Sequence, residues 1–485
     1  MRKLFFTLFS SLLLAFTYGQ TNVSGGIYSN TTWTSVNSPY IVTDTVVVFP
    51  GFTLTIEPGV TVKFNDGVVI EMRQSNFIAV GNSVDSITFT SNSSTPVAGI
   101  YQGLYFNDPT GIAIDYCVFK YALKAIYTKP WITFPLTVSH STFSFNSDCL
   151  TQNVNGTNIF QCVFINNVIG MSWSGGACNL DNCYFENNTV AARVGGNRVN
   201  NCTFINNQVG LDAGEPGPTI ITDCYFCNND YACRVADDVG GNQSNFDTIT
   251  GCTFSHNHIA YSDQFTYMTE NIFFENDTAL SQISFHDSID FWHRTRTHMF
   301  NNDIFNNHVG IVFRGGYSPN SNTNNFCQNS VYNIVYTSSN NGAFPDQCYC
   351  ITDSTQIAAA VYDGYDDITL GLLNFTPYAN CNDSVLPVDT FYFCQNIVSG
   401  INPVKFPEES FTIYPNPTSS TFTLKNIAYS EKQLLYIFNT LGKIVYLEKL
   451  FGKNEYLIDA NLTKGIYFIR VSDGAKSFVK KLVFE

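Results

Sequence analysis

The chain has 485 residues and a formal net charge of −15. So acidic a protein repels the phosphates of nucleic acids and the surface of anionic membranes, and we exclude both as general partners. Hydrophobic residues make up 44% of the chain and charged residues 13%, which is too apolar for disorder, although no stretch reaches the ~20 apolar residues of a transmembrane helix. The composition predicts a folded protein without a transmembrane segment.

The amino terminus has the layout of an export signal. Arg2 and Lys3 precede an apolar run from Leu4 to Phe16, and the small residue Gly19 stands before Gln20. A charged start, a short apolar core and a small residue at the cleavage point are typical of a secretory signal peptide. We expect residues 1–19 to be removed and the mature protein to lie outside the cytoplasm.

The body of the chain is a repeat of about 21 residues. Its clearest copies read CVFINNVIG from Cys162, CYFENNTVA from Cys183, CTFINNQVG from Cys202, CYFCNNDYA from Cys224 and CTFSHNHIA from Cys252. Each copy has one aromatic or aliphatic anchor near its start. We place the anchors at Phe119, Phe143, Phe164, Phe185, Phe204, Phe226, Phe254, Phe274 and Ile304.

A repeat of this length without helical periodicity has to consist of short strands and turns. One such coil buries little by itself, but coils stacked at the ~4.8 Å strand spacing enclose a continuous core. The sequence therefore predicts an all-β chain whose body, residues 20–384, is a parallel β-helix. A leucine-rich repeat has a similar period, but the leucines that it requires are absent.

Asparagine at the turn of each copy tolerates left-handed backbone and can pair with the asparagine of the next coil. We expect this ladder at Asn166, Asn187, Asn206, Asn228 and Asn276, interrupted by His256. Small residues recur six places after the anchors, and we interpret them as tight corners. They are Ala125, Gly170, Ala191, Gly210, Ala232, Ala260 and Gly310.

The first coils carry a recognisable sequence. The runs LTIEPGVTVKF from Leu54 to Phe64, ITFTS from Ile87 to Ser91 and YQGLYF from Tyr101 to Phe106 resemble the opening coils of secreted bacterial right-handed parallel β-helix proteins. The resemblance covers residues 27–380. It implies the right-handed fold and leaves the activity open.

Charge and cysteine content change near residues 385–407, which we interpret as a linker. Residues 21–407 hold 12 basic and 31 acidic residues, a net charge of −19, whereas residues 408–485 hold 10 basic and 8 acidic residues. All 15 cysteines precede residue 395. Two different kinds of domain are therefore joined here.

The final segment, residues 408–485, has the alternating pattern of a small β-sandwich. Its IYPNP run from Ile413 to Pro417 and its LTKGIYFIRV run from Leu462 to Val471 are similar to the C-terminal sorting domain, type A, of the type IX secretion system of Bacteroidota. The resemblance implies the type IX machinery as a partner. It also implies a secreted or surface-attached protein from which the tail is removed.

The repeated cysteines share one inward position, where a free cysteine acts as a small hydrophobic residue. Cys224 and Cys227 have the spacing of a zinc ligand pair, but on a strand they face opposite ways, so we predict no metal site. Disulfides are expected instead among cysteines outside the repeat position. The candidates are Cys348, Cys350, Cys381 and Cys394, with their pairing open.

Eight residues after each anchor, an outward position carries Arg193, Asp212 and Arg234 on adjacent coils. Such a row can be an ion-pair ladder on a solvated sheet. It also resembles the face on which β-helix polysaccharide lyases place an arginine base and acidic calcium ligands. In that reading Arg193 or Arg234 is the base, and Asp237 and Asp238 lie close by.

The long insertions after the anchors Phe226 and Phe274 leave from the same corner of the coil, and a third follows Arg314. Insertions in a solenoid gather on one face, which is often the binding face. Trp292, His293, Arg294 and Tyr317 lie on them, and this mixture of aromatic platforms and donors suits sugar rings. We count them as ligand-binding candidates, together with the residues of the outward row.

Two functions remain open. The first is a non-catalytic binding or adhesion module for an extracellular polysaccharide or a host surface glycan. The alternative is a polysaccharide lyase that acts on an acidic glycan. We expect no cofactor for the first, and calcium for the second because a body charged −19 attracts an anionic polymer only through a bridging cation.

Overall fold

The computed structural model describes residues 19–130, 134–152, 156–173, 178–196, 198–213, 219–235, 247–262, 266–284, 297–314, 320–351, 353–380, 412–425, 433–439, 444–450, 455–460, 462–472 and 477–484. The chain forms two compact units, Met1–Leu386 and Pro387–Glu485. Within the described ranges, no helix is long and apolar enough to cross a membrane.

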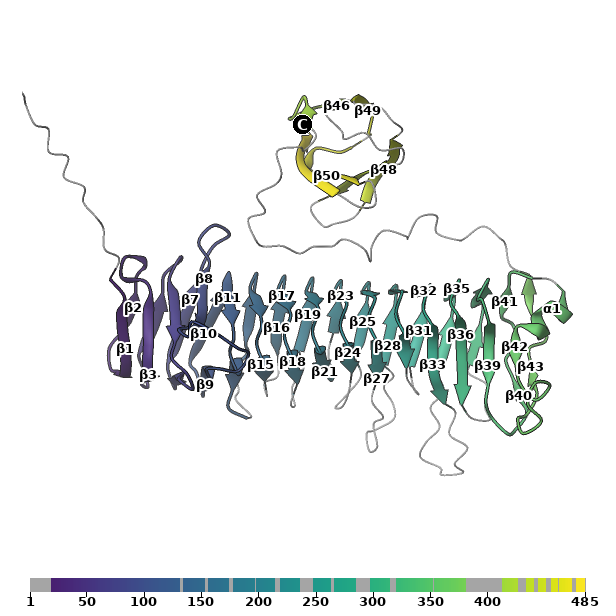
Figure 1. Ribbon diagram of the computed structural model, residues 1–485, viewed down its shortest axis with the longest axis horizontal. Helices are drawn as coiled ribbons and strands as arrows, with labels where there is room; N and C mark the ends of the chain where they lie inside the picture. The colour runs from purple at the N-terminus through teal and green to yellow at the C-terminus, as the bar shows by residue number, and fades with distance from the viewer. Residues whose placement is uncertain are drawn as a thin grey trace, which may run out of the picture. The chain divides into compact units, whose positions relative to one another are not determined.

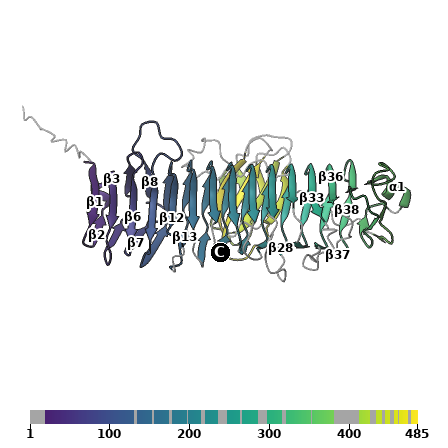
Figure 2. The same ribbon diagram turned by 90° about the horizontal axis from the view of Figure 1, so that it is seen from below.

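The first unit is a parallel β-helix in which a full coil contributes one strand to each of three rows (Figures 1 and 2). The described strands of the first and second rows, together with β1 and β3, form one 29-stranded sheet, and those of the third row form a 13-stranded sheet. The pairings between coils are parallel, as in β20 with β23 and β21 with β24, and the register shifts within β1–β3 and β33–β36. The predicted solenoid is therefore confirmed.

The first row comprises β5 (Thr61–Phe64), β8 (Ile87–Ser91), β11 (Cys117–Lys120), β14 (Thr142–Ser144), β17 (Val163–Ile165), β20 (Tyr184–Glu186), β23 (Thr203–Ile205), β26 (Tyr225–Cys227), β29 (Thr253–Ser255), β32 (Ile272–Phe274), β35 (Asp303–Phe305), β38 (Asn325–Cys327), β41 (Cys348–Tyr349) and β44 (Ala379–Asn380). The second row comprises β6 (Val69–Arg73), β9 (Gly103–Asn107), β12 (Lys124–Thr128), β15 (Asp148–Gln152), β18 (Ile169–Trp173), β21 (Val190–Val194), β24 (Val209–Ala213), β27 (Tyr231–Val235), β30 (Ile259–Ser262), β33 (Thr278–Ser284), β36 (Val309–Arg314), β39 (Tyr332–Tyr336) and β42 (Val361–Tyr362).

The third row comprises β2 (Thr31–Trp33), β4 (Thr53–Ile56), β7 (Asn76–Val80), β10 (Gly111–Asp115), β13 (Thr137–Ser139), β16 (Thr157–Phe160), β19 (Cys178–Asp181), β22 (Arg198–Asn200), β25 (Ile220–Thr222), β28 (Asp247–Thr250), β31 (Thr266–Thr269), β34 (His298–Phe300) and β37 (Asn320–Asn322). At the amino-terminal end, β1 (Thr21–Ile27) and the long β3 (Tyr40–Val48) pair along most of their length, with a 3₁₀ turn, Ser35–Asn37, between β2 and β3.

A continuous stack of phenylalanine rings fills the interior. Neighbouring rings lie 4.6 to 4.9 Å apart between centroids and are parallel to within 7°. Its members are Phe89, Phe119, Phe143, Phe164, Phe185, Phe204, Phe226, Phe254 and Phe273. The anchor predicted at Phe274 is wrong by one residue, because Phe254 pairs with Phe273 and Phe273 with Ile304.

The turn between the first and second rows uses two consecutive residues with different tasks. The first has a positive φ, as at Asn187 (55°) and Asn206 (55°), which suits asparagine. The second is buried, and its Oδ1 accepts the backbone N–H and the Nδ2 of its counterpart one coil earlier at 2.9 to 3.1 Å. The buried ladder comprises Asn146, Asn167, Asn188, Asn207, Asn229, Asn257, Asn276 and Asn307.

The prediction that Asn166, Asn187, Asn206 and Asn228 form the buried ladder is therefore wrong by one residue, although Asn276 is placed correctly. The side chain of the left-handed residue points outward, so Asn206 is exposed whereas Asn207 is 2% exposed. Residues at this left-handed position still contact one another between coils, as where Asn228 donates to Asn206 and where His256 pairs with Glu275.

The small residues do not form corners as predicted, because those described in strands lie inside the second row. At Gly170 in β18, an added Cβ would lie 2.3 Å from the carbonyl oxygen of Ala191 in the next coil. At Gly210 the corresponding oxygen, that of Ala232, lies at 2.4 Å. Close approach between coils explains the small side chains.

The inward cysteines stack as predicted. The backbone N–H groups of Cys183, Cys202 and Cys224 each point at the Sγ of the cysteine one coil later, 3.4 Å away. After Cys252 the same position holds Asn271, whose Oδ1 accepts the Cys252 N–H at 2.9 Å. Asparagine thus replaces cysteine as the acceptor without interrupting the stack.

One disulfide joins Cys327 to Cys350 on successive coils. Cys348 and Cys227 are disulfide-bonded as well. The expectation that Cys348 and Cys350 form disulfides is confirmed, whereas Cys227 and Cys327 were missed because they occupy the outward end of a repeat strand. Cys381 and Cys394 lie outside the described residues.

The carboxyl-terminal end of the solenoid departs from the repeat. It contains a two-stranded parallel sheet of β40 (Gly342–Ala343) and β43 (Leu373–Asn374), and a short helix α1 (Ser354–Ala359). Asp353 caps α1 by accepting the N–H of Thr355 at 2.8 Å. These elements close the open end of the core.

The second unit is a small β-sandwich with its own core around Phe422, Ile437 and Ile469. Its described strands form two antiparallel sheets, with the strand orders β45-β46-β49 and β48-β47-β50-β51. The strands are β45 (Thr412–Tyr414), β46 (Phe422–Lys425), β47 (Gln433–Asn439), β48 (Ile444–Leu450), β49 (Glu455–Ile458), β50 (Gly465–Ser472) and β51 (Ser477–Phe484).

Candidate functional site

The second-row strands present one outward residue per coil, and we call this row the ridge. Parallel register brings Arg193 on β21, Asp212 on β24 and Arg234 on β27 side by side. The ridge comprises Glu71, Tyr105, Tyr127, Thr151, Ser172, Arg193, Asp212, Arg234 and Ser262.

Arg193, Asp212 and Arg234 form the ladder predicted from the sequence. Two guanidinium nitrogens of Arg234, Nε and Nη2, donate to Asp212 at 2.9 Å. Arg193 approaches the same carboxylate from the other side, with 3.4 Å between Nε and Oδ2. The pKa of Arg234 is raised, chiefly by its hydrogen bond to Asp212. Arg234 therefore stays protonated, which suits an ion pair and not a base.

Farther along the ridge, Asp148 opens β15 beside two hydroxyl groups. Its Oδ2 accepts from Ser172 at 2.6 Å and from Thr151 at 2.7 Å, while Oδ1 is buried without a hydrogen-bond partner. Burial raises the pKa of this carboxyl, and the two hydroxyls, Lys124 and Arg193 oppose the rise. The higher pKa reflects the removal of water from a carboxylate that is buried among neighbouring side chains.

Two aromatic side chains extend the ridge toward the amino terminus. The rings of Tyr105 and Tyr127 stack with centroids 4.8 Å apart, and the Lys124 ammonium lies 5.8 Å from the centre of the Tyr127 ring. Burial, with Tyr105 and Glu71 nearby, raises the pKa of Tyr127 to about 12. Glu71 in turn binds Arg73 through two hydrogen bonds of 2.9 and 2.8 Å. Most charges on this face are therefore already paired.

The remaining predicted site residues, Asp237, Asp238, Trp292, His293, Arg294 and Tyr317, lie outside the described residues. The strand bounds nevertheless locate the insertions that contain them. Each insertion joins a second-row strand to the next third-row strand, after Val235, Ser284 and Arg314. All three therefore leave from one corner of the coil, between the ridge and the third row.

On the other side of that corner, the third row is hollowed by a cavity of about 590 Å³, which we call the groove. One line of its wall consists of Thr137, Asn158, Asn179 and Arg198, which pair in register on β13, β16, β19 and β22. A second line contains Phe160, Asp181 and Asn200. The groove thus runs across four successive coils.

Side chains in the groove bond from coil to coil. Asn179 donates to Asn158 at 3.0 Å, and Asn200 donates to Asp181 at 2.6 Å. Thr222 continues the second line by donating to Asn200 at 2.7 Å. Among the described residues, Arg198 makes no ion pair. Its guanidinium therefore supplies donors beside the amides of Asn179 and Asn200 and the carboxylate of Asp181.

Sequence reasoning missed the groove, although a periodic signal marks it. Asn158, Asn179 and Arg198 each stand four residues before a repeat cysteine, and Asp181 and Asn200 stand two before. In later coils, the position in register with Arg198 holds Ile220, and in still later coils Tyr267 and His298 occupy the same row. Ile220 and Tyr267 are 46% and 39% exposed. The offsets identify outward positions, whereas the hollow itself depends on the shape of the sheet.

No group of three metal-ligating side chains occurs in the part of the chain that the structure describes. On the ridge, Glu71 is bound to Arg73, and both oxygens of Asp212 are bound to arginines. Asp237 and Asp238, the calcium ligands considered for a lyase, lie outside the described residues.

Comparison with known proteins identifies the tail. Residues 412–485 match the family model of the secretion system C-terminal sorting domain. The resemblance noted in the sequence is thus confirmed, and the protein is secreted through the type IX system to the cell surface or the extracellular space. No curated protein matches the chain. Among solved structures, a mutant tailspike protein of E. coli bacteriophage HK620 in complex with pentasaccharide aligns at 9% identity and a TM-score of 0.22, covering 91% of this chain and 86% of that one.

Proposed function

We propose that the solenoid is a non-catalytic binding or adhesion module that holds an extended, largely uncharged glycan. The observation that carries the proposal is the groove, where the polar side chains of Thr137, Asn158, Asn179 and Arg198 lie in register, one on each of four successive coils. An extended polymer that lies along the solenoid axis would meet hydrogen-bonding groups from each of these coils.

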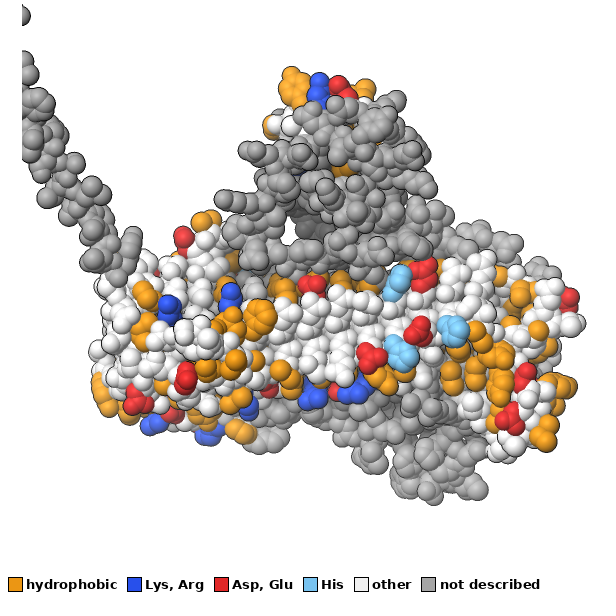
Figure 3. Space-filling model, in the orientation of Figure 1, with side chains coloured by type: hydrophobic (Ala, Val, Ile, Leu, Met, Phe, Trp, Pro, Cys, Tyr) orange, Lys and Arg blue, Asp and Glu red, His pale blue; other side chains and the backbone are white. Residues whose placement is uncertain are grey.

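The charge distribution favours a neutral ligand. The body carries −19, and the face seen in Figure 3 consists mainly of uncharged side chains and backbone, with charged groups scattered among them. On the ridge, Arg193 and Arg234 are both already paired with the carboxylate of Asp212. An acidic polymer would be repelled at long range and would find few unpaired cations.

The corner insertions add the aromatic groups that a sugar-binding surface needs. Trp292, His293, Arg294 and Tyr317 belong to segments between β33 and β34 and between β36 and β37, which leave from the corner that borders the third row, four and five coils beyond β22 at the end of the groove. Stacking of a sugar ring on Trp292 would complement the amides of the groove. This role remains a prediction from the sequence.

The alternative, a polysaccharide lyase, requires an arginine that loses its proton. Arg234 is bound to Asp212 through two hydrogen bonds that raise its pKa. An arginine base needs the opposite shift. The ladder therefore supports the binding module over the lyase.

Affinity gel electrophoresis of the mature chain through soluble neutral and acidic polysaccharides tests the proposal. We expect retardation by a neutral polymer. Arg198→Ala and Asn179→Ala should each weaken binding about tenfold, the effect of losing one or two good hydrogen bonds. Trp292→Ala should weaken binding more than Arg234→Ala.

Arg193→Ala is the matched control, since it removes the same charge from the ridge, on the other side of the corner. Equal effects of Arg193→Ala and Arg198→Ala would contradict a site in the groove. Calcium-dependent release of unsaturated sugars that Arg234→Ala abolishes would establish the lyase instead.

A further inference from the structure

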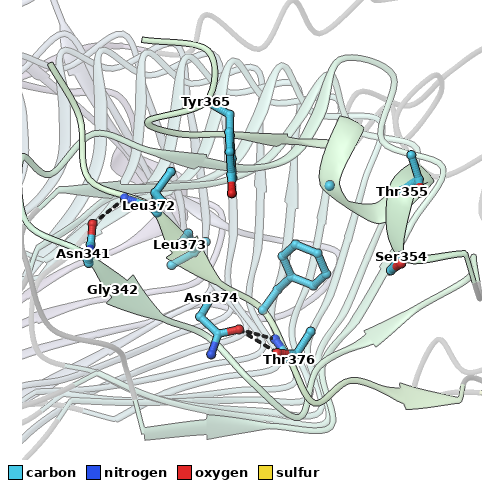
Figure 4. A pocket seen from close by; sticks show the side chains of 11 residues that line it. Asn341, Gly342, Ser354, Thr355, Tyr365, Leu372, Leu373, Asn374 and Thr376 are labelled. Atoms are coloured by element: carbon cyan, nitrogen blue, oxygen red, sulfur yellow. Dashed lines mark hydrogen bonds between the residues drawn. The ribbon is translucent and has the colours of Figure 1, made fainter. Parts of the chain in front are cut away.

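A second cavity, of about 700 Å³, lies at the carboxyl-terminal end of the solenoid. It is bordered by the β40–β43 sheet on one side and by the start of α1 on the other (Figure 4). The groove lies in the third row between β13 and β22, so the two cavities share no residue. We call this second cavity the cap pocket.

The apolar part of the cap pocket is unusually exposed. Tyr365, which points into the space between β43 and α1 in Figure 4, is 86% exposed, and Leu372 is 39% exposed. Phe375 adds a third apolar side chain to the lining. Large apolar groups gathered in the open around a hollow are typical of a ligand site.

The polar part of the pocket contains two amide groups with fixed orientation. Asn374 Oδ1 accepts the N–H of Thr376 at 3.0 Å and its hydroxyl at 2.7 Å. Asn341 Oδ1 accepts the N–H of Leu372 at 2.8 Å. Because these donors fix the positions of the oxygens, both Nδ2 groups remain as donors, and neither has a partner within the described residues.

The charge of the lining restricts the chemistry of the ligand further. None of the residues that line the cap pocket carries a charged side chain. A charged ligand would therefore lose its hydration without gaining an ion pair. The ligand should be neutral, present acceptors to the amide donors and offer an apolar patch to Tyr365 and Leu372.

We propose that the cap pocket binds one neutral sugar residue that carries an acetamido group. The acetamido carbonyl accepts from Asn374 or Asn341, its methyl group packs on Leu372 and Phe375, and the sugar ring stacks on Tyr365. The site is independent of the glycan proposed for the groove.

Saturation-transfer NMR on the mature full chain tests the inference, with methyl N-acetyl-β-glucosaminide as the probe. We expect saturation of the acetyl methyl group and none for methyl β-glucoside, which lacks the acetamido group. Tyr365→Ala should reduce binding about tenfold or more, as expected for loss of an aromatic platform. Equal signals from the two probes, or unchanged binding by Tyr365→Ala, would overturn the proposal.

Two further variants separate recognition from folding. Asn374→Asp keeps an oxygen for Thr376 and replaces the amide donor with a carboxylate oxygen that repels the acetamido carbonyl, so it should weaken binding while the fold is retained. Ile368→Ala removes another apolar side chain, 96% exposed and outside the pocket, and should bind normally. Arg198→Ala should also bind normally, which distinguishes failure of the groove from failure of the cap pocket. Loss of binding in either of these controls would contradict the site.

Discussion

A single buried asparagine in each coil joins that coil to its neighbours. Asn207 accepts the N–H and the Nδ2 of Asn188 through one oxygen, and it donates to the Phe185 carbonyl at 3.1 Å and to Asn229 at 3.0 Å. At 2% exposure, water cannot replace these partners. Each asparagine is therefore needed by the coil before it and the coil after it.

Asn207→Leu should lower the free energy of unfolding by roughly 3 to 5 kcal/mol. The substitution leaves several buried polar groups without partners, at about 1 to 3 kcal/mol each. Thermal denaturation measures the loss, and faster hydrogen exchange at the Asn188 amide would localise it.

Asn206→Gly is the control for Asn207→Leu. Glycine adopts the φ of 55° at this exposed position without strain, so stability should change little. A larger loss of unfolding free energy from Asn206→Gly than from Asn207→Leu would show that the buried ladder has been assigned to the wrong asparagine.

The two asparagines also show what a sequence can specify at this scale. The Asn-Asn pair predicts a turn with one left-handed residue and an amide ladder, and both are present. Which of the two asparagines faces inward depends on the backbone direction at the turn. Both repeat with the same period, so the sequence pattern does not distinguish them. Phe273 and Phe274 were confused for the same reason.

Asp148 predicts a dependence of stability on pH. Its pKa in the folded protein is raised, so between its ordinary value and the raised value the folded state binds more protons than the unfolded state. The contribution of Asp148 to stability is therefore complete below its ordinary pKa and is lost as the pH rises through the raised pKa.

Asp148→Asn removes this titration. Relative to the wild type, the variant should gain stability as the pH increases from about 4 to about 7. Unfolding midpoints measured across that range test the prediction. A difference between the two proteins that stays constant with pH would rule it out.

At the scale of elements, the strands of each row act together because their side chains stack. The phenylalanine stack runs along the first row, and the Cys327–Cys350 disulfide ties β38 to the coil that closes the solenoid. Near that end, Phe274, Phe305 and Cys327 form a separate outward cluster. The disulfide thus reinforces the end of the array, where a coil has a neighbour on one side only.

Replacing Cys327 and Cys350 together with serine should lower the free energy of unfolding by about 3 kcal/mol, the value expected for a closed loop of this size. The separation is 23 residues. Chemical denaturation of the double variant measures the effect, and the last coils should unfold first. An unchanged denaturation midpoint would show that the bond adds nothing to the stability of the array.

The elements were largely predictable and the candidate site was not. The length of the repeat, the alternation of apolar and polar residues and the turn residues predicted the stacked strands. The positions of the insertions within the repeat predicted the corner from which the loops leave. The ladder of Arg193, Asp212 and Arg234 followed from counting eight residues past the anchors. The outward positions of the groove follow a periodic pattern, but its hollow depends on the shape of the third row, and the cap pocket lies where the repeat ends, so neither cavity could be predicted from the sequence.

At the scale of the whole molecule, the two units have separate cores and separate tasks. The solenoid core contains Phe204 and Leu211, whereas the sandwich core contains Phe422 and Ile469. The sandwich matches the sorting domain, so it directs secretion and does not need to support the fold of the body.

Deleting residues 412–485 should therefore abolish export across the outer membrane while the body still folds. Cell fractionation should find the truncated chain in the periplasm, and its circular dichroism should retain the β-helix signal. Normal delivery to the surface would contradict the role of the tail, and an unfolded body would contradict the independence of the two units.

The interval between ladder residues has a genetic consequence. Asn188 and Asn207 are 19 residues apart, and Cys183, at the same position of its coil as Cys202, precedes it by the same interval. An in-frame loss of residues 183–201 would join Asn182 to Cys202 and present Asn207 to Asn167 in place of Asn188. Gene duplication or deletion in units of one coil thus keeps the asparagine ladder and the stacked cysteine position continuous, while surface contacts such as that of Arg193 with Asp212 change, so this protein can become longer or shorter in evolution without redesign of its interior.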